Sequence, residues 1–238
     1  MDWHTLTAAL FPQGASIVEA HQVLTGEGTV GDTTIAVVGT TGHTPIGVDV
    51  ALAQARFILQ TVREHPGRPI LILVDTQGQR LRHRDEMLGI NAFMAHLGKC
   101  VELARRSGHR IVALVYDQAL SGGFITSGLM ADACYALPHA TIRVMGLPAM
   151  ARITKVPEER LTELAVDNPV FAPGPENYLL MGGIQEIWRD DLAARLLEAL
   201  ALESTGDVRP ALGLARGGRV LSQRVIAAIL AGQDTLAP

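Results

Sequence analysis

Glycine follows an apolar run at two points of the chain where free backbone N–H groups could do chemistry. One point lies within residues 112–137, VALVYDQALSGGFITSGLMADACYAL, where a strand pattern leads into Ser121, Gly122 and Gly123 and then into a helical pattern. Glycine lets a substrate approach the backbone closely, and the first N–H groups of a helix have no partner within it. These donors, together with the positive end of the helix dipole, suit a developing oxyanion. The alternative is a tight turn that only packs a helix on a strand.

The second point lies within residues 71–86, LILVDTQGQRLRHRDE, which again runs from a strand pattern through a glycine loop into a helical pattern. Asp75 and Gln77 are expected to shape the turn, and Gly78 could offer its N–H toward the same point as the loop at residue 122. The pair of junctions therefore predicts two walls of one oxyanion site, with Gly78, Gly122 and Gly123 as catalytic backbone positions and Gln77 and Ser121 beside the substrate.

Three arginines follow this second glycine at alternate positions, Arg80, Arg82 and Arg84. In an extended loop they would point to one side, where they could bind a carboxylate, a phosphate or the acidic surface of a carrier protein. The alternative is a solvated loop whose charges are balanced by Asp85 and Glu86 at the next helix start. Both interpretations remain open from the sequence.

Other residue types give little support for a metal, a nucleotide or a disulfide. His43 lies alone in the glycine loop VVGTTGHTPIG, and a lone loop histidine is usually a turn or surface residue. Cys100 and Cys134 are 34 residues apart, with no CxxC and no histidine at ligand spacing, so no metal site is predicted and a reducing cytoplasmic setting is expected. Neither a dinucleotide-binding glycine motif nor a P-loop occurs.

Three β-branched runs must position these residues, at Ile35–Val38, Ile70–Val74 and Ile111–Tyr116. Each is followed by a glycine-containing loop and a helical pattern, and the spacing is about 40 residues. Apolar residues at 4-3-4-3 spacing predict helices over 48–62 and 87–104, and a third helix begins at Gly122 and runs to Met130. Further strand-like or helical pieces are expected at 16–24, 134–136, 141–144, within 157–175, around 192–200 and at about 216–232.

These patterns favour one α/β domain, residues 1–238, built as a spiral of ββα turns with a helical C-terminal extension. The chain has 238 residues, of which 48% are hydrophobic and 18% charged, so a packed aliphatic core is feasible and disorder is not expected. A net charge of -4 argues against nucleic acid or anionic membrane as partner. The N-terminus lacks a basic segment, and no apolar run approaches the ~20 residues of a membrane span. The expected location is the cytoplasm.

The two junctions together resemble the carboxyltransferase branch of the crotonase/ClpP superfamily, in which a D-T-x-G loop and a later S-G-G helix start form the site. The stretches LRHRDEMLGINAFMAHLGKCVELAR and NPVFAPGPENYLLMGGIQEIW are similar to the gamma subunit of biotin-independent malonate decarboxylase. The likeness is clearest over residues 16–190. It implies a crotonase-type fold and an enzyme that decarboxylates a malonyl thioester.

The resemblance also implies partners. A homologous beta subunit would complete the site, and the substrate would be malonyl thioester on an acyl carrier protein that bears a phosphoribosyl-dephospho-CoA arm. An acyl carrier protein transferase subunit is a further expected partner. Gly122 and Gly123 would take the oxyanion-hole role, with Gly78 and its neighbours as the opposite wall, and the complex would release CO2 and acetyl-acyl carrier protein.

Three other functions stay open at this stage. An alpha-type carboxyltransferase subunit of an acyl-CoA carboxylase would share the fold and the enolate. A ClpP-like peptidase would use Ser121, but Met145 and Gly146 stand where its base histidine is expected. A non-catalytic scaffold that only completes its partner's site is the third. The chain is expected to bury on the order of 2,000 Å² or more against its partner, with the apolar face of the helix over 85–107 as one contact.

Overall fold

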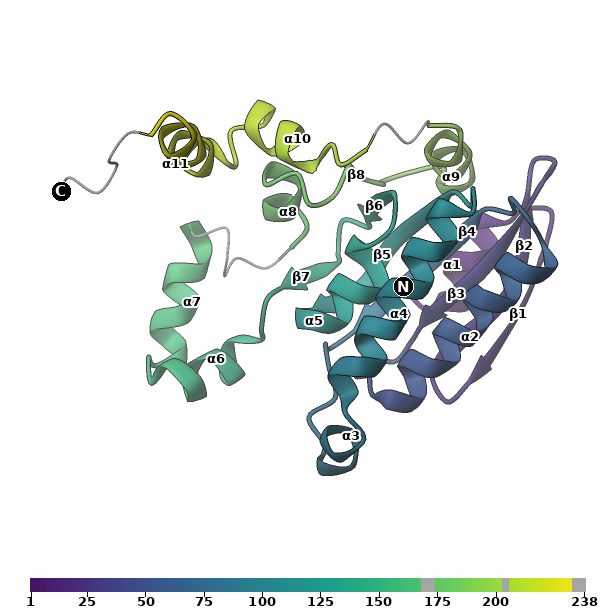
Figure 1. Cartoon of the computed structure of the whole chain (residues 1–238), viewed down its shortest axis with the longest axis horizontal. Coiled ribbons are helices and arrows are strands. Elements are labelled where there is room, and N and C mark those ends of the chain that lie inside the picture. Colours follow the sequence, from purple (N-terminus) through teal and green to yellow (C-terminus); the bar gives the residue numbers. More distant parts are fainter. Residues whose placement is uncertain (168–173, 203–205, 233–238) are drawn as a thin grey trace.

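One eight-stranded sheet organises the computed structural model of the chain, which describes residues 1–167, 174–202 and 206–232 (Figure 1). The strand order is β1-β2-β3-β4-β5-β6-β8, and β7 pairs with β5. The three predicted core strands are adjacent and parallel, because β3 pairs with β4 and β4 with β5. The strands are β1 (Ala15–Ala20), β2 (Val23–Val30), β3 (Thr33–Thr40), β4 (Ile70–Thr76), β5 (Ile111–Leu120), β6 (Ala133–Ala136), β7 (Thr141–Arg143) and β8 (Glu186–Ile187).

Helices cover both faces of the sheet, as the alternation of buried side chains requires. Ile70, Ile72 and Val74 of β4 face a core shared with α2 (Val48–Glu64) and α4 (Ile90–Arg106). Leu71 and Leu73 face the opposite core, shared with α1 (Trp3–Leu10) and α9 (Leu192–Ala201). Every residue of β4 is buried, and each such aliphatic side chain stabilises the fold by about 1.5–3 kcal/mol. This packing fixes the strand ends from which the candidate site is built.

The predicted strand over 16–24 is two strands. β1 and β2 form an antiparallel hairpin that turns at His21 and Gln22, whose φ values are 52° and 64°. Positive φ at both central residues is the geometry of a two-residue type I′ turn, which usually carries Asn or Gly. Because neither residue is a strong turn former, the hairpin could not be predicted from the sequence. Helix α1 was also missed, although Asp2 caps it by accepting the N–H groups of His4 and Thr5.

The helix predicted over 48–62 is confirmed as α2, but the one over 87–104 is interrupted. Gly89 has a φ of 77° and separates a short helix, α3 (His83–Met87), from α4. Met87 was expected to share the buried face of α4; it lies on α3 instead and is 74% exposed. The helix expected from Gly122 to Met130 forms as α5 (Ser121–Phe124), followed by one π-helical turn over Ile125–Leu129.

The C-terminal part forms short helices beside the sheet, as Figure 1 shows on its left. α7 is the one helix expected within 157–175, whereas α6 was not foreseen, and residues 168–173 lie outside the described part. The single helix predicted over 216–232 is preceded by another, α10, and begins only at Val220. These helices are α6 (Leu147–Thr154), α7 (Glu158–Asp167), α8 (Glu176–Leu180), α10 (Arg209–Ala215) and α11 (Val220–Leu230).

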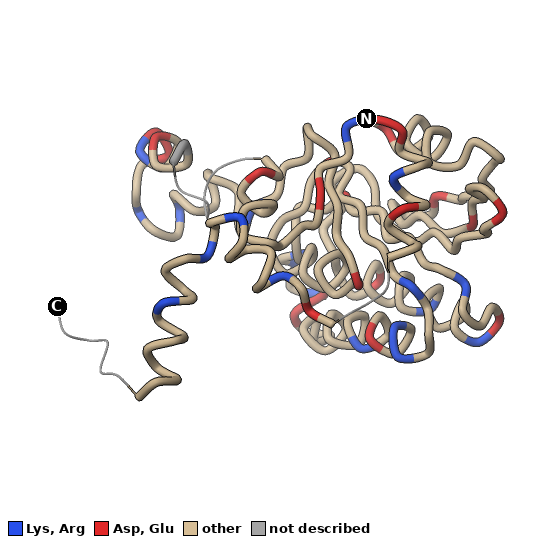
Figure 2. Tube along the Cα trace, turned by 90° about the horizontal axis from the view of Figure 1, so that it is seen from above, with Lys and Arg blue, Asp and Glu red and all other residues tan. Residues whose placement is uncertain are grey.

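Helix α11 extends away from the body of the molecule and carries few charges along its length (Figure 2). Its side chains include several exposed large apolar ones, of which Leu221 is 74% and Ile229 63% exposed. No helix in the described part of the chain is long and apolar enough to cross a bilayer. Exposed apolar residues of this kind form a surface that is suited to a binding contact.

Candidate active site

The two strand–glycine–helix junctions lie in direct contact at the ends of β4 and β5. A Cβ atom built on Gly123 would lie 2.9 Å from the carbonyl carbon of Gly78, and one built on Gly78 would lie 2.9 Å from the Cβ of Ser121. Only glycine permits so close an approach at these two positions, and Gly78 also has a φ of 101°. The structure therefore brings Gly78, Ser121 and Gly123 together, as the sequence analysis expected.

A network of backbone hydrogen bonds holds the first junction in place. The hydroxyl of buried Thr76 donates to the carbonyl of Thr44 at 2.7 Å and accepts the N–H of Gly78 at 3.1 Å. The N–H of Ile46 donates to the carbonyl of Gly78 at 2.8 Å, and the N–H of Arg80 returns a bond to Ile46 at 2.9 Å. Since its N–H is already bonded to Thr76, Gly78 forms a wall of the site rather than supplying a free donor. The expectation that its N–H points at the common site is wrong in this geometry.

The second junction keeps its donors at the start of a helix. β5 divides where it ends, because residues 112–115 pair with β6 and residues 118–120 with β7. Ser121 then takes a φ of 54°, a left-handed conformation that costs a non-glycine residue roughly 1–2 kcal/mol. Helix α5 begins there, so the N–H groups of Gly122 and Gly123 lie in its first turn, where no helical acceptor exists. Strain of this kind often accompanies function.

The turns that follow stabilise this helix start. The hydroxyl of Ser127 donates to the carbonyl of Gly123 at 2.6 Å, and the hydroxyl of Thr126 lies 3.2 Å from the carbonyls of both Gly122 and Gly123. These bonds fall where the helix widens into its π turn, an irregularity that is frequent at functional sites. Ser121 and Gly122 are half-buried and Gly123 is buried, so the helix start is accessible from one side.

Glutamine lines the site, but not the predicted one. The amide oxygen of Gln79 lies 3.0 Å from where a Cβ on Gly122 would stand, whereas Gln77 is an exposed residue that donates its N–H to the carbonyl of His43 at 3.4 Å. Met94 of α4 also borders Gly122.

The three arginines do not form one basic edge. Arg82 pairs with the buried carboxylate of Asp85 at 2.7 Å, and Arg84 binds Asp49 with two hydrogen bonds of 2.6 and 3.2 Å. Arg84 belongs to α3 rather than to the extended loop, so the expectation that all three point to one side is wrong. In the described part of the chain, the guanidinium of Arg80 makes no hydrogen bond or ion pair. Arg82 and Arg84 are thus balanced by nearby acids, as the second interpretation of the sequence expected, whereas Arg80 is not paired in this way.

The pKa values of two aspartates in this region, Asp85 and Asp75, are shifted in opposite directions. Burial alone would raise the pKa of Asp85, but the N–H of Val48 and the Arg82 guanidinium outweigh it, and the pKa is lowered. At Asp75 burial prevails, so its pKa is raised even though the N–H groups of His43 and Gln118 donate to it. The anionic form of Asp85 is therefore stabilised, whereas the anionic form of Asp75 is less favourable than that of an exposed aspartate.

His43 is part of a cluster rather than isolated. Its Nε2 lies 3.3 Å from a carboxylate oxygen of Asp117 and 3.6 Å from one of Asp75, and these three ligand-type atoms lie within 4.8 Å of one another. His43 also has a φ of 52°. Both oxygens of Asp75 already accept backbone N–H groups. The cluster therefore holds the glycine loop after β3 against the ends of β4 and β5. Most of its potential metal-ligand atoms already take part in contacts within the protein.

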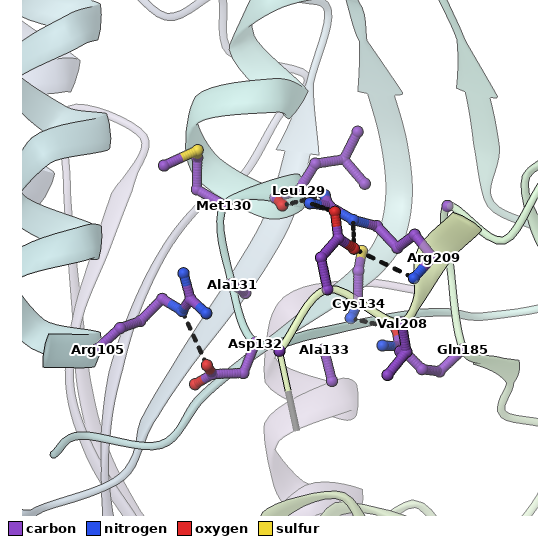
Figure 3. Close-up of a pocket in the computed structure, with 13 residues that line it drawn as sticks. Arg105, Leu129, Met130, Ala131, Asp132, Ala133, Cys134, Gln185, Val208 and Arg209 are labelled. Carbon is purple, nitrogen blue, oxygen red and sulfur yellow. Dashed lines mark hydrogen bonds and ion pairs between the residues drawn. The ribbon is translucent and has the colours of Figure 1, made fainter. Parts of the chain in front are cut away.

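A small cavity of about 190 Å³ lies on another side of the molecule, at the start of β6 (Figure 3). Arg105 pairs there with Asp132 at 2.8 Å, and Arg209 binds Asp207 at 2.7 Å and the carbonyl of Leu129 at 2.9 Å. Burial raises the pKa of the Cys134 thiol to about 12, so this thiol is not a nucleophile at neutral pH. Both arginines of this cavity are paired, which makes it a structural site.

The overall arrangement is that of the crotonase-type carboxyltransferases. A Pseudomonas malonate decarboxylase hetero-tetramer in complex with coenzyme A contains a chain that superposes with a TM-score of 0.79 and 24% identity, covering 95% of this chain and 97% of that one. A chain of the transcarboxylase 12S hexamer superposes with a TM-score of 0.72 and 19% identity, covering 87% of this chain and 44% of that one. The predicted fold class is confirmed.

Sequence comparison identifies the family within this class. The model of the malonate decarboxylase gamma subunit matches residues 41–233. The malonyl-S-ACP:biotin-protein carboxyltransferase MADD of Malonomonas rubra is 34% identical over a 204-residue alignment that covers 76% of this chain and 70% of the relative. The chain belongs to the malonate decarboxylase gamma-subunit family, as its sequence predicted, and is a subunit of a decarboxylase-type enzyme.

Proposed function

We propose that the helix start at Gly122 and Gly123 stabilises a thioester enolate when a malonyl thioester loses CO2. The observation that supports this most directly is the contact of Gly78 with Ser121 and Gly123, which braces a pair of backbone donors at an accessible helix start. Breaking the C–C bond of the malonyl group leaves its electron pair on the thioester oxygen. One preorganised donor to such an oxyanion contributes about 2.7–4 kcal/mol, so two would accelerate the reaction by roughly 10⁴-fold or more.

This chemistry needs no nucleophile within the chain. The bond that breaks belongs to the substrate, and the enolate can take its proton from water. In the described part of the chain no histidine is hydrogen-bonded to the Ser121 hydroxyl, which removes the support that a serine peptidase mechanism would require. Ser121 and Gln79 are assigned to substrate contact, and Gln79 takes the place that the sequence suggested for Gln77.

The partner is proposed to be a homologous beta subunit that completes the site. The helix start is open on one side, and the relative of known structure is a hetero-tetramer. The sequence analysis chose the apolar face over 85–107 as the contact, but Leu97, Val101 and Ala104 of α4 are buried against the chain's own sheet. Within that range Met87, Leu88 and Leu103 are exposed, and further exposed apolar residues lie at Leu81 and on α11. We assign the interface to the surface around α3 and to α11.

The thioester is proposed to arrive on an acyl carrier protein with a phosphoribosyl-dephospho-CoA arm, loaded by a transferase subunit. The support is the family, together with a curated relative that acts on malonyl-S-ACP. The whole chain, residues 1–238, would act as one domain with its helical extension, in the cytoplasm.

Transfer of the carboxyl group to a biotin protein is the second candidate function, because the curated relative is such a transferase. Both reactions pass through the same enolate, so the glycine site serves either. They differ in the fate of the carboxyl group, which is released as CO2 in one and captured in the other. We favour biotin-independent release, since the family match is to the decarboxylase.

The test is to assay the chain with its beta subunit on malonyl-acyl carrier protein in the presence of a biotin carrier protein, with and without avidin. We expect CO2 and acetyl-acyl carrier protein in the presence of avidin, and little product from either subunit alone. Complete inhibition by avidin would establish the carboxyltransferase instead. Equal activity of the beta subunit alone would reduce this chain to a scaffold.

A further inference from the structure

A cavity of about 590 Å³ lies where the turn of the β1–β2 hairpin meets the first turns of α2. Its volume is in the range of small-molecule sites. Its walls are mainly apolar and come from Ala20, Val23, Val50 and Ala53, with Thr25 and the exposed turn residues beside them. The residue that sets its chemistry is Arg80, which enters from the loop that follows Gly78.

The stem of Arg80 is held in place, but its guanidinium makes no direct ion pair with any described residue. Its backbone N–H donates to Ile46 at 2.9 Å, and its Cδ lies 3.1 Å from where a Cβ on Gly47 would stand, so glycine makes room for its stem. The Nε atom is buried and has no hydrogen-bond partner among the described residues. A buried donor without a partner is unfavourable. Because this Nε is closed to solvent, an anion in the cavity would bind the terminal nitrogens of the same guanidinium.

The two aspartates near Arg80 form their ion pairs with other arginines. Asp49 also lines the cavity, yet it binds Arg84 at 2.6 Å and approaches Arg82 at 3.9 Å, and no ion pair joins it to Arg80. Asp85 is bound to Arg82 and to the N–H of Val48. The Arg84 hydrogen bonds lower the pKa of Asp49, so this acid stays charged. Arg80 therefore borders a mainly apolar space without a direct ion pair, although its charge also acts on Asp85 and helps to lower the pKa of that acid.

We propose that this cavity binds an organic anion, with a carboxylate or phosphate on Arg80 and an apolar portion against Val23, Val50 and Ala53. The inference rests on the proposed function in one respect, that the anion belongs to the substrate or to the arm that carries it. The malonyl carboxylate and the phosphates of the arm share this chemistry. Of the three arginines, only Arg80 has the role, and Arg82 and Arg84 hold the loop.

The test measures binding to the full chain by calorimetry, with malonate, coenzyme A and inorganic phosphate as probes. We expect at least one organic probe to bind more tightly than inorganic phosphate, and Arg80→Gln to weaken that binding at least tenfold. Asp49→Asn removes a negative charge from the cavity wall and should tighten it, whereas Arg63→Gln, which removes an exposed arginine at the far end of α2, should leave it unchanged. Ala53→Leu should fill the cavity and weaken binding without altering Arg80.

The probes also separate the two sources of the anion. Preference for malonate identifies the reacting carboxylate, and preference for coenzyme A identifies the arm. Equal affinity of wild type and Arg80→Gln for every probe overturns the proposal, as does the absence of binding at millimolar concentration. Because binding is read without turnover, an Arg80-dependent site in a complex that does not decarboxylate would refute the proposed reaction while leaving this site intact.

In the assembled complex the same variant should affect one kinetic constant. If Arg80 binds the arm, Arg80→Gln raises KM at least tenfold, leaves kcat within about twofold, and loses its effect as salt rises. A purely structural role would instead lower the unfolding temperature without this salt dependence.

Discussion

The junctions after β4 and β5 have the same order of strand, glycine and helix, yet they direct their N–H groups differently. At the first, the N–H of Gly78 is bonded to Thr76, and the helix begins only after several further residues. At the second, α5 begins directly after the last residue of β5, so the N–H groups of Gly122 and Gly123 have no acceptor within the helix. A glycine after a strand can therefore either shape the wall of a site or supply a free N–H donor to it. The distance from strand to helix decides which.

The largest effect is expected from Gly123→Val, because Gly123 belongs to both junctions. Its side chain would collide with the backbone of Gly78 and with Ile46, each 2.9 Å from the Cβ position. We expect a loss of about 1–3 kcal/mol in unfolding free energy and a fall in turnover of about 10²–10³-fold. Denaturant unfolding and the decarboxylation assay measure the two quantities.

Gly98→Ala is the matched control, since a Cβ at Gly98 of α4 meets no atom within 4 Å. It should stabilise the helix by up to about 1 kcal/mol and keep full turnover. Wild-type turnover in Gly123→Val would contradict the assignment of the oxyanion site.

The second-largest effect is expected from a change that affects only the Gly78 loop. Thr76→Val leaves the N–H of Gly78 and the carbonyl of Thr44 without their hydroxyl partner in a buried setting. We expect about 1–3 kcal/mol of destabilisation and about tenfold lower turnover as the Gly78 loop shifts. Thr126→Val is the counterpart at the other junction, where the hydroxyl only supplements helix carbonyls at 3.2 Å, and it should cost less than about 1 kcal/mol. Equal losses in the two variants would mean that the junctions are held alike.

The dependence of stability on pH should differ between variants of Asp75 and Asp85. The pKa of Asp85 is lowered, so its contribution is present above the unfolded-state pKa of about 3.9 and is lost as pH falls through the folded-state value. The pKa of Asp75 is raised by burial, so the contribution of Asp75 to stability is fully present below the unfolded-state pKa of about 3.9 and is lost as pH rises through the folded-state value. Asp85→Asn should flatten the acid loss, and Asp75→Asn should steepen it. Urea midpoints between pH 3 and 7 measure both, and parallel profiles would refute the contrast.

The sequence predicted what depends on local periodicity. The apolar alternation of β4 and the 4-3-4-3 pattern of α2 located a core strand and a helix, and the glycine motifs located the junctions. It could not predict pairings made by tertiary structure. Asp49 and Arg84 are 35 residues apart, and nothing in either segment shows that they meet. The turn at His21 was missed because neither His21 nor Gln22 is a usual residue of a type I′ turn. The break at Gly89 was missed because a single glycine inside a helical pattern is often tolerated.

The smallest effect on turnover is expected at Ser121, and it separates an enolate site from a nucleophile. Ser121 stands beside the free donors with a φ of 54° and no histidine bonded to it in the described part of the chain. Ser121→Ala keeps the backbone and the N–H groups, so turnover should stay within about threefold, whereas loss of a nucleophile would lower it by several orders of magnitude. Ser121→Gly should also relieve the left-handed strain, offset in part by the greater entropy of unfolded glycine, for a net gain of up to about 1 kcal/mol. Steady-state kinetics and thermal unfolding of the two variants decide the matter: abolished turnover in Ser121→Ala with normal folding would restore the peptidase-like interpretation, and preserved turnover leaves the backbone of Gly122 and Gly123 as the group that acts.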